Sequence, residues 1–294
     1  MAGLNIGNFS VGEVMEWKGI YRDPLEMYPD ATQRKVDQHR GWLEPHSIDP
    51  TTGRVIMAFR SYLIRTERLT ILVDACVGNH KERPVRPAWH RQNWPWMENL
   101  RAQGVAPEEI DIVMCTHLHT DHVGWNTVLI NDKWEPTFKK ADYLFGKDEW
   151  NYTEKQIKIP AYAEFINDSI IPIIESGLVK FVEVDEKICE EVRLEPTIGH
   201  TPGHVSIKIE SKGKRASITG DFLHHPCQME KLDWISSADW NPELAKETRK
   251  KKLLEYANEE TLVFGTHFAT PSAGFVRRKD DHFIFEVQHP LEKR

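Results

Sequence analysis

The strongest constraint on the fold is a short segment rich in metal-binding side chains, residues 117–122 (HLHTDH). It directly follows the apolar run at residues 110–115, which is typical of a buried strand. Neutral imidazoles and a carboxylate suit Zn, Fe, Mn or Co better than Mg or Ca. A His-rich turn can also be a plain solvated loop, but such loops rarely place four ligands after a core strand. The segment supplies two histidines two residues apart for one ion and a second pair of side chains for another; these residues are His117, His119, Asp121 and His122.

Three further segments carry metal-capable side chains near the ends of predicted strands, at residues 199–204 (GHTPGH), 219–221 (TGD) and 265–268 (GTHF). Each has a plain alternative when taken singly. His200 could be a polar turn residue, Asp221 an Asx turn and His267 a satisfied core histidine. Together and in this order, the four segments resemble the metal-binding motifs of the metallo-β-lactamase superfamily over roughly residues 55–275.

The resemblance implies an α/β fold, the four-layer αββα sandwich, with a metal site on loops at one edge of the sheets. It implies that His117, His119 and His200 hold one ion. It also implies that Asp121, His122 and His267 hold a second, with Asp221 and a hydroxide bridging the pair. The expected cofactor is two divalent ions, most naturally Zn, with Fe, Mn or Co as alternatives. Such a pair lowers the pKa of water and polarises a carbonyl or phosphoryl oxygen.

Two residues near these ligands have predicted supporting roles. The resemblance leaves His204 outside the metal shell, where it would orient a ligand or pack. Asp74 ends a predicted strand, and it is expected either to orient His117 or His119 or to form a plain strand-end turn.

His224 stands three residues after Asp221, where lactonases that open acyl-homoserine lactones carry a tyrosine. We predict that His224 hydrogen-bonds the substrate oxygen or passes a proton to the leaving group. A solvent-facing loop histidine is the alternative. The predicted catalytic residues are therefore Asp121, Asp221 and His224.

The ligand set discriminates between branches of the superfamily. True β-lactamases generally lack an aspartate at the position of Asp221, and the Fe flavoproteins carry a glutamate at that of His119. The resemblance is therefore to the lactonase and organophosphate-hydrolase-like branch, which implies a dinuclear hydrolase. It would open a lactone or cleave a related ester by attack of the metal-bridging hydroxide. Phosphate triester hydrolysis, a mononuclear iron dioxygenase of the same fold and a non-enzymatic metal-binding role are the alternatives.

The composition of the chain indicates which classes of partner and which cellular compartment to expect. The net charge of −7 argues against nucleic acid, which needs clustered basic residues. Four scattered cysteines indicate free thiols in a reducing compartment. The sequence lacks a secretory signal pattern and any apolar run long enough to span a membrane, so we expect a cytoplasmic protein with no membrane partner. The sequence leaves open whether it forms a homodimer.

Two basic runs, at residues 81–86 and 249–252, are predicted to be solvated, although the first could meet an anionic substrate. Several aromatic residues could wall a pocket for an apolar or aromatic lactone or ester, with a core role as the alternative. They are Trp89, Trp94, Trp96, Trp125, Phe222 and Phe268.

Periodicity and turn residues predict a single domain over residues 1–294, with an irregular N-terminal extension at about 1–54 and a helical insertion at about 147–175. The resemblance implies that this insertion contributes a lid. Helix is predicted at 94–103. Strands are predicted at 5–20, 55–64, 69–74, 110–115, 141–145, 179–184, 192–196, 205–210, 215–219, 261–264 and 283–287. The strand at 55–64 is expected to pair with that at 69–74 through a short polar turn at 65–68, and the strand at 205–210 with that at 215–219.

Overall fold

The computed structural model describes residues 3–38 and 40–288, so the first two residues of the predicted N-terminal extension and the last six of the predicted domain lie outside it. The chain forms two compact units. The first comprises Met1–Trp17 and Phe59–Glu186, and the second Lys18–Ala58 and Lys187–Arg294. Within the described ranges, the helices are too short or too polar to cross a membrane.

A seven-stranded sheet is the frame of the first unit, in the order β1-β2-β3-β4-β5-β8-β9. Strands β3 and β4 pair antiparallel through a short polar turn, as predicted, and β4, β5, β8 and β9 run parallel. Parallel strands end at the same edge, so the loops after β4, β5 and β8 start side by side. The strands are β1 (Leu4–Ile6), β2 (Phe9–Ile20), β3 (Ile56–Arg65), β4 (Thr70–Val73), β5 (Ile112–Met114), β8 (Asp142–Gly146) and β9 (Val179–Val182).

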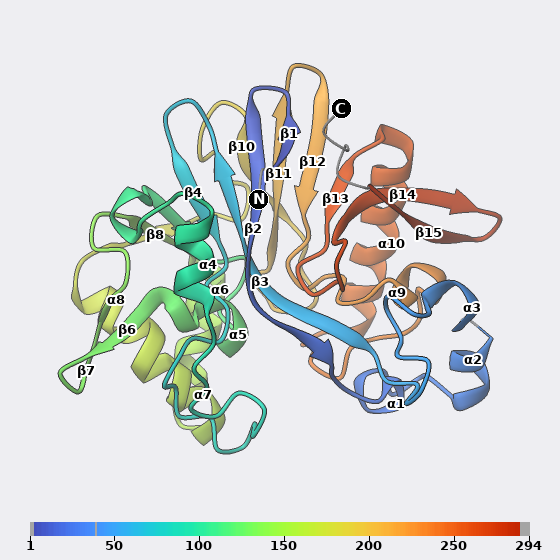
Figure 1. Ribbon diagram of the computed structural model, residues 1–294, viewed down its shortest axis with the longest axis horizontal. Coiled ribbons are helices and arrows are strands. Elements are labelled where there is room, and N and C mark those ends of the chain that lie inside the picture. The colour runs from blue at the N-terminus through green and yellow to red at the C-terminus, as the bar shows by residue number, and fades with distance from the viewer. Residues whose placement is uncertain (1–2, 39, 289–294) are drawn as a thin grey trace. The chain divides into compact units, whose positions relative to one another are not determined.

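Helices pack against this sheet around one apolar cluster, which includes Trp96 and Leu100 of α4 and Ile166 and Ile170 of a π-helical turn (Figure 1). The predicted insertion is indeed helical, and Pro160 and Pro172 stand at helix starts, where a missing N–H is harmless. Its role as a lid stays a prediction. The helices are α4 (Trp96–Ala102), α5 (Thr120–Val123), α6 (Lys147–Thr153), α7 (Pro160–Phe165), η4 (Ile166–Ile170) and α8 (Ile171–Glu175).

A six-stranded sheet, in the order β10-β11-β12-β13-β14-β15, forms the second unit. Strand β11 is antiparallel to β10 and β12, and β12 is parallel to β13. Strands β10, β12 and β13 therefore all end at the same edge. The strands are β10 (Val192–Pro196), β11 (Val205–Ser211), β12 (Lys214–Ile218), β13 (Leu262–Phe264), β14 (Ala273–Lys279) and β15 (His282–Val287).

Long helix α10 (Pro242–Glu259) packs against β14, and short helix α9 (Cys227–Glu230) packs against β15 (Figure 1). The part of the N-terminal extension after β2 folds into α1 (Pro24–Met27), α2 (Gln33–Asp37) and α3 (Arg40–Leu43) rather than remaining irregular. The Asp23 and Thr32 side chains cap the first two of these helices. Sequence patterns also missed β14 and the hairpin of β6 (Thr127–Ile130) and β7 (Lys133–Pro136).

The prediction that both basic runs are solvated is wrong for half of their charges. Lys81 and Arg83 are fully buried in the first unit, and Arg249 and Lys252 are buried in the second. Arg249 donates to the carbonyl oxygens of residues 222, 232 and 234. Buried charges of this kind persist because each one is paired or hydrogen-bonded.

Candidate metal centre

The 117–122 segment lies directly after β5, at the edge where the parallel strands of the first unit end. His117 and His122 are buried, while Asp121 lies in the first turn of α5. His117 Nε2 and His119 Nδ1 are 3.0 Å apart. Ligands of one tetrahedral zinc lie roughly 3.3 Å from each other. These two nitrogens are therefore close enough to be a ligand pair, and the ion that they would hold stays a prediction.

Asp74 organises the backbone and one ring of this segment. Its Oδ1 accepts a hydrogen bond of 2.7 Å from the Thr116 amide, and its Oδ2 lies 3.0 Å from His122 Nδ1. Asp74 therefore contacts His122 directly, which the sequence did not predict. It reaches His117 through Thr116 Oγ1, which lies 3.0 Å from Asp74 Oδ2 and 3.2 Å from His117 Nδ1. Strand pairing decides this, because β4 and β5 end side by side and bring Asp74 to the start of the segment.

Two further buried groups hold the same segment, and no sequence pattern pointed to either. Glu149 of α6 accepts a 3.0 Å hydrogen bond from the Leu118 amide. Arg83 donates to Thr120 Oγ1 at 2.7 Å and pairs with both oxygens of Asp168, at 2.7 and 3.0 Å. Burial by itself would raise the pKa of Asp168, but the charges of Lys81 and Arg83 hold it below its ordinary value. The Arg83–Asp168 pair thus fixes the start of α5.

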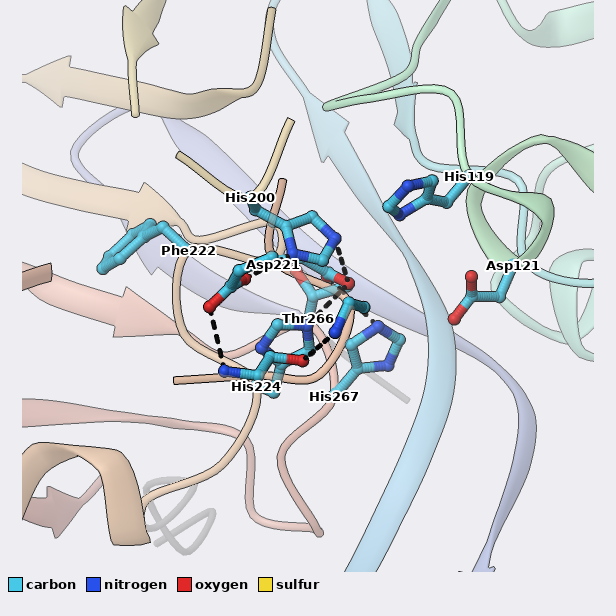
Figure 2. Close-up of polar contacts among 12 residues, drawn as sticks. His119, Asp121, His200, Asp221, Phe222, His224, Thr266 and His267 are labelled. Carbon is cyan, nitrogen blue, oxygen red and sulfur yellow. Dashed lines mark hydrogen bonds and ion pairs between the residues drawn. The ribbon is translucent and has the colours of Figure 1, made fainter. Parts of the chain in front are cut away.

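In the second unit, His200, Asp221 and His267 lie on the loops after β10, β12 and β13. Figure 2 shows that these side chains and His224 turn toward one another. Asp221 lies at the centre: its Oδ1 is 3.1 Å from His267 Nε2, and its Oδ2 is 3.6 Å from His200 Nε2 and 3.3 Å from His224 Nε2. His200, Asp221 and His224 offer ligand atoms within 4.8 Å of one another, so the group could hold a metal ion.

The ring nitrogen that points away from Asp221, Nδ1, has different surroundings in His200, His267 and His224. His200 Nδ1 donates to Asp239 Oδ1 at 2.8 Å, and His267 Nδ1 donates to the Ala58 carbonyl at 3.1 Å. Metal-binding histidines almost always donate their second ring N–H in this way. His224 Nδ1 is buried without a hydrogen-bond partner among the described residues. His200 and His267 therefore have the surroundings of ligands, and His224 does not.

His224 itself is buried, so the alternative of a solvent-facing loop histidine is wrong. Burial lowers the pKa of His224 below its usual value, although the Asp221 carboxylate acts in the opposite direction. One of its ring nitrogens, Nε2, lies 3.3 Å from Asp221 Oδ2.

His204 supports the Asp221 loop. The Asp221 amide donates to His204 Nε2 at 2.7 Å, so the ring proton sits on Nδ1 and faces Thr197 Oγ1 at 2.8 Å. With both nitrogens engaged inside the protein, His204 has none left for a metal. The contact with the Asp221 amide agrees with a position outside the metal shell, and the orientation of a ligand by His204 stays a prediction.

Aromatic residues expected at a pocket wall are mostly core residues. Trp96 and Trp125 stack in the core of the first unit, and Phe222 and Phe268 belong to an apolar cluster of the second. Trp89 is also nearly buried, and Trp94 is partly exposed. These side chains therefore give little support to the hypothesis of an aromatic pocket wall.

Comparison with known proteins identifies the family. The sequence profile of the metallo-beta-lactamase superfamily matches residues 60–267, which is most of the chain. The chain therefore belongs to the metallo-beta-lactamase superfamily, as its motifs predicted, and has the α/β fold of that family.

Several relatives in this superfamily carry names that describe lactone chemistry. An N-acyl homoserine lactonase from Bacillus sp is 27% identical over 219 residues, covering 70% of this chain and 79% of the relative. The Bacillus cereus enzyme of the same name is 26% identical over 219 residues, which again cover 70% of this chain and 79% of the relative.

Solved structures show the same fold over nearly the whole chain. The hydrolase AbOPH of the beta lactamase superfamily has a TM-score of 0.82 at 23% identity, covering 98% of both chains. The dizinc quorum-quenching lactonase AidC, solved with the product N-hexanoyl-L-homoserine, has a TM-score of 0.79 at 19% identity, covering 99% of both.

Proposed function

We propose that this protein is a metal-dependent hydrolase that opens a lactone or cleaves a related ester. The observation that carries the proposal is the arrangement around Asp221, where His200 and His267 face one carboxylate and each is oriented through its other ring nitrogen. Oriented imidazoles with a carboxylate are the donor set of a catalytic divalent metal. The lactonase names of the relatives support the choice of substrate.

We propose the ligand set that the family resemblance implies. His117, His119 and His200 would hold one ion, Asp121, His122 and His267 would hold the other, and Asp221 would bridge them. The donor chemistry fits such ions within each unit, because His117 Nε2 and His119 Nδ1 converge in the first and His200 and His267 face Asp221 in the second. When bound, two divalent ions, most naturally zinc, would lower the pKa of water and polarise the carbonyl of the substrate.

The protein's own groups would then position the substrate and move protons. We propose that His224 either donates a hydrogen bond to the substrate oxygen or shuttles a proton to the leaving group. As a shuttle, it would take the proton that the attacking water loses and hand it to the departing alkoxide. Burial favours the uncharged ring, which can accept a proton before it donates one. Asp121 and Asp221 would act as ligands that keep the attacking water in place.

The test is proton release from a panel of acyl-homoserine lactones, simple lactones, aryl esters and phosphate triesters. Protein freed of metal and reloaded with Zn²⁺, Co²⁺, Mn²⁺ or Fe²⁺ would be assayed with and without a chelator. We expect chelator-sensitive lactone opening. Preference for the triesters would change the substrate class. Absence of turnover by metal-loaded protein, or oxygen consumption with a persulfide, would overturn the proposal.

A further inference from the structure

Asp239 is a buried carboxylate that no sequence motif singles out, and it contacts one candidate ligand directly. Its side chain is 1% exposed, and its Oδ1 accepts the Nδ1–H of His200 at 2.8 Å. Its other oxygen accepts a 2.9 Å hydrogen bond from the Ser236 amide. Both carboxylate oxygens are therefore engaged, each with a different partner.

Arg249 of α10 supplies a charge behind this carboxylate. Its guanidinium lies 3.7 Å from Asp239 Oδ2 and is itself fully buried. Arg249 also donates to the carbonyl oxygens of Leu232 and Trp234. With the Ser236 amide donating to Oδ2 and the Arg249 guanidinium beside it, the carboxylate of Asp239 is surrounded by donors, and the ring nitrogen that faces Oδ1 is the donor of that hydrogen bond.

The backbone around Asp239 is tied to the loop that carries His200. The Trp240 amide donates to the His200 carbonyl at 3.0 Å, and the Asn241 amide donates to the Gly199 carbonyl at 2.9 Å. Gly199 has φ 141°, and a Cβ at that position would lie 2.4 Å from the Ala245 amide nitrogen of α10. The approach of the two segments thus requires glycine, and it sets the distance at which Asp239 reaches the ring.

We propose that Asp239 is a positioning residue: it holds His200 in the Nδ1–H tautomer, so that the Nε2 lone pair faces Asp221 and is presented to a divalent ion. The inference deepens the proposed function, because it rests on His200 being a ligand. An imidazole carries one ring proton when neutral, so an acceptor fixed at Nδ1 keeps Nε2 unprotonated and able to bind a metal. Loss of such a partner typically costs 10- to 100-fold in metal affinity.

Three variants separate positioning from folding. Asp239→Ala removes the acceptor. Asp239→Asn keeps the volume but has one oxygen for two donors, so it can serve either His200 or the Ser236 amide. Asp233→Asn is the matched control, because it removes the same charge from an exposed position in the same loop. If Asp239→Ala fails to fold, Asp239→Asn carries the test.

The first measurement is the ring tautomer of His200 in metal-free protein, from long-range ¹H–¹⁵N NMR with the signal assigned by a His200→Gln variant. We expect Nδ1–H in the wild type and in Asp233→Asn. We expect a shift toward Nε2–H in Asp239→Ala, and a partial shift in Asp239→Asn. An unchanged tautomer in these two variants would overturn the proposal, since a merely structural carboxylate would not control the ring proton.

The second measurement is Zn²⁺ affinity by competition with a chromogenic chelator. We expect a loss of about 10- to 100-fold in both Asp239 variants and none in the control. Unchanged affinity would also contradict the inference. Failure of the wild type to bind Zn²⁺ would instead refute the proposed function, while the tautomer measurement, which needs neither metal nor substrate, would still decide the role of Asp239.

Discussion

The two units build their metal-capable groups in opposite ways. In the first unit, all four side chains come from the six residues 117–122, which follow one strand. In the second, His200, Asp221 and His267 come from three loops that follow three different strands. Local spacing creates the first group, whereas the order and direction of strands create the second.

The supports differ as well. Buried charged side chains hold the segment of the first unit: Asp74, Glu149 and the Arg83–Asp168 pair. In the second unit, each candidate ligand has its own partner, namely Asp239, the Ala58 carbonyl or His204. The difference suggests that damage to one support spreads through the first unit but stays with one side chain in the second.

The largest expected effect is at the centre of the second unit. Replacing Asp221 by Ala should lower the hydrolysis rate by several orders of magnitude and reduce the metal content. The effect is large because removing one member of a catalytic unit costs about as much as removing all of them. Metal analysis and proton release would measure both. Wild-type stoichiometry and turnover in this variant would contradict the dinuclear assignment and the central place of Asp221.

Arg83→Met tests the charged support of the first unit. Removing Arg83 leaves Asp168 buried opposite Lys81 alone, and breaking a buried pair costs about 3–5 kcal/mol in the free energy of unfolding. Urea unfolding would measure it. The matched control is Arg91→Met, which breaks an exposed pair with Glu82 and should cost about 0–1 kcal/mol. Equal losses in the free energy of unfolding in the two variants would contradict the claim that the buried Arg83–Asp168 pair supports the first unit.

His225 allows a pH test in the second unit. Burial lowers its pKa to about 4, and its Nε2–H donates to the Ser47 carbonyl at 2.9 Å. The unfolded chain therefore binds the proton first, so the free energy of unfolding should fall by roughly 3 kcal/mol as pH drops from about 6.5 to about 4. His225→Asn should flatten this part of the profile and exposed His46→Asn should not. Parallel profiles for all three proteins would refute the assignment.

The smallest expected effect is at His224. Replacing it by Phe should lower lactone turnover by about 10- to 100-fold, the value of one hydrogen bond to a developing charge, and should leave metal content unchanged. Loss of one ion would instead place His224 among the ligands. It would contradict the contrast between the oriented rings of His200 and His267 and the ring of His224, whose Nδ1 has no hydrogen-bond partner within residues 3–38 and 40–288.

The sequence by itself determined the superfamily, the β3–β4 and β11–β12 pairings and the 117–122 segment, because these depend on local periodicity and contiguous motifs. Only the tertiary structure decided that Asp74 faces His122 and that Asp239 meets His200. It also decided that Arg83 and Arg249 are buried rather than solvated. Partners of this kind are set by which strands end side by side and which loops are tied together. A carboxylate or guanidinium that holds a ligand has the same sequence signature as one that faces water.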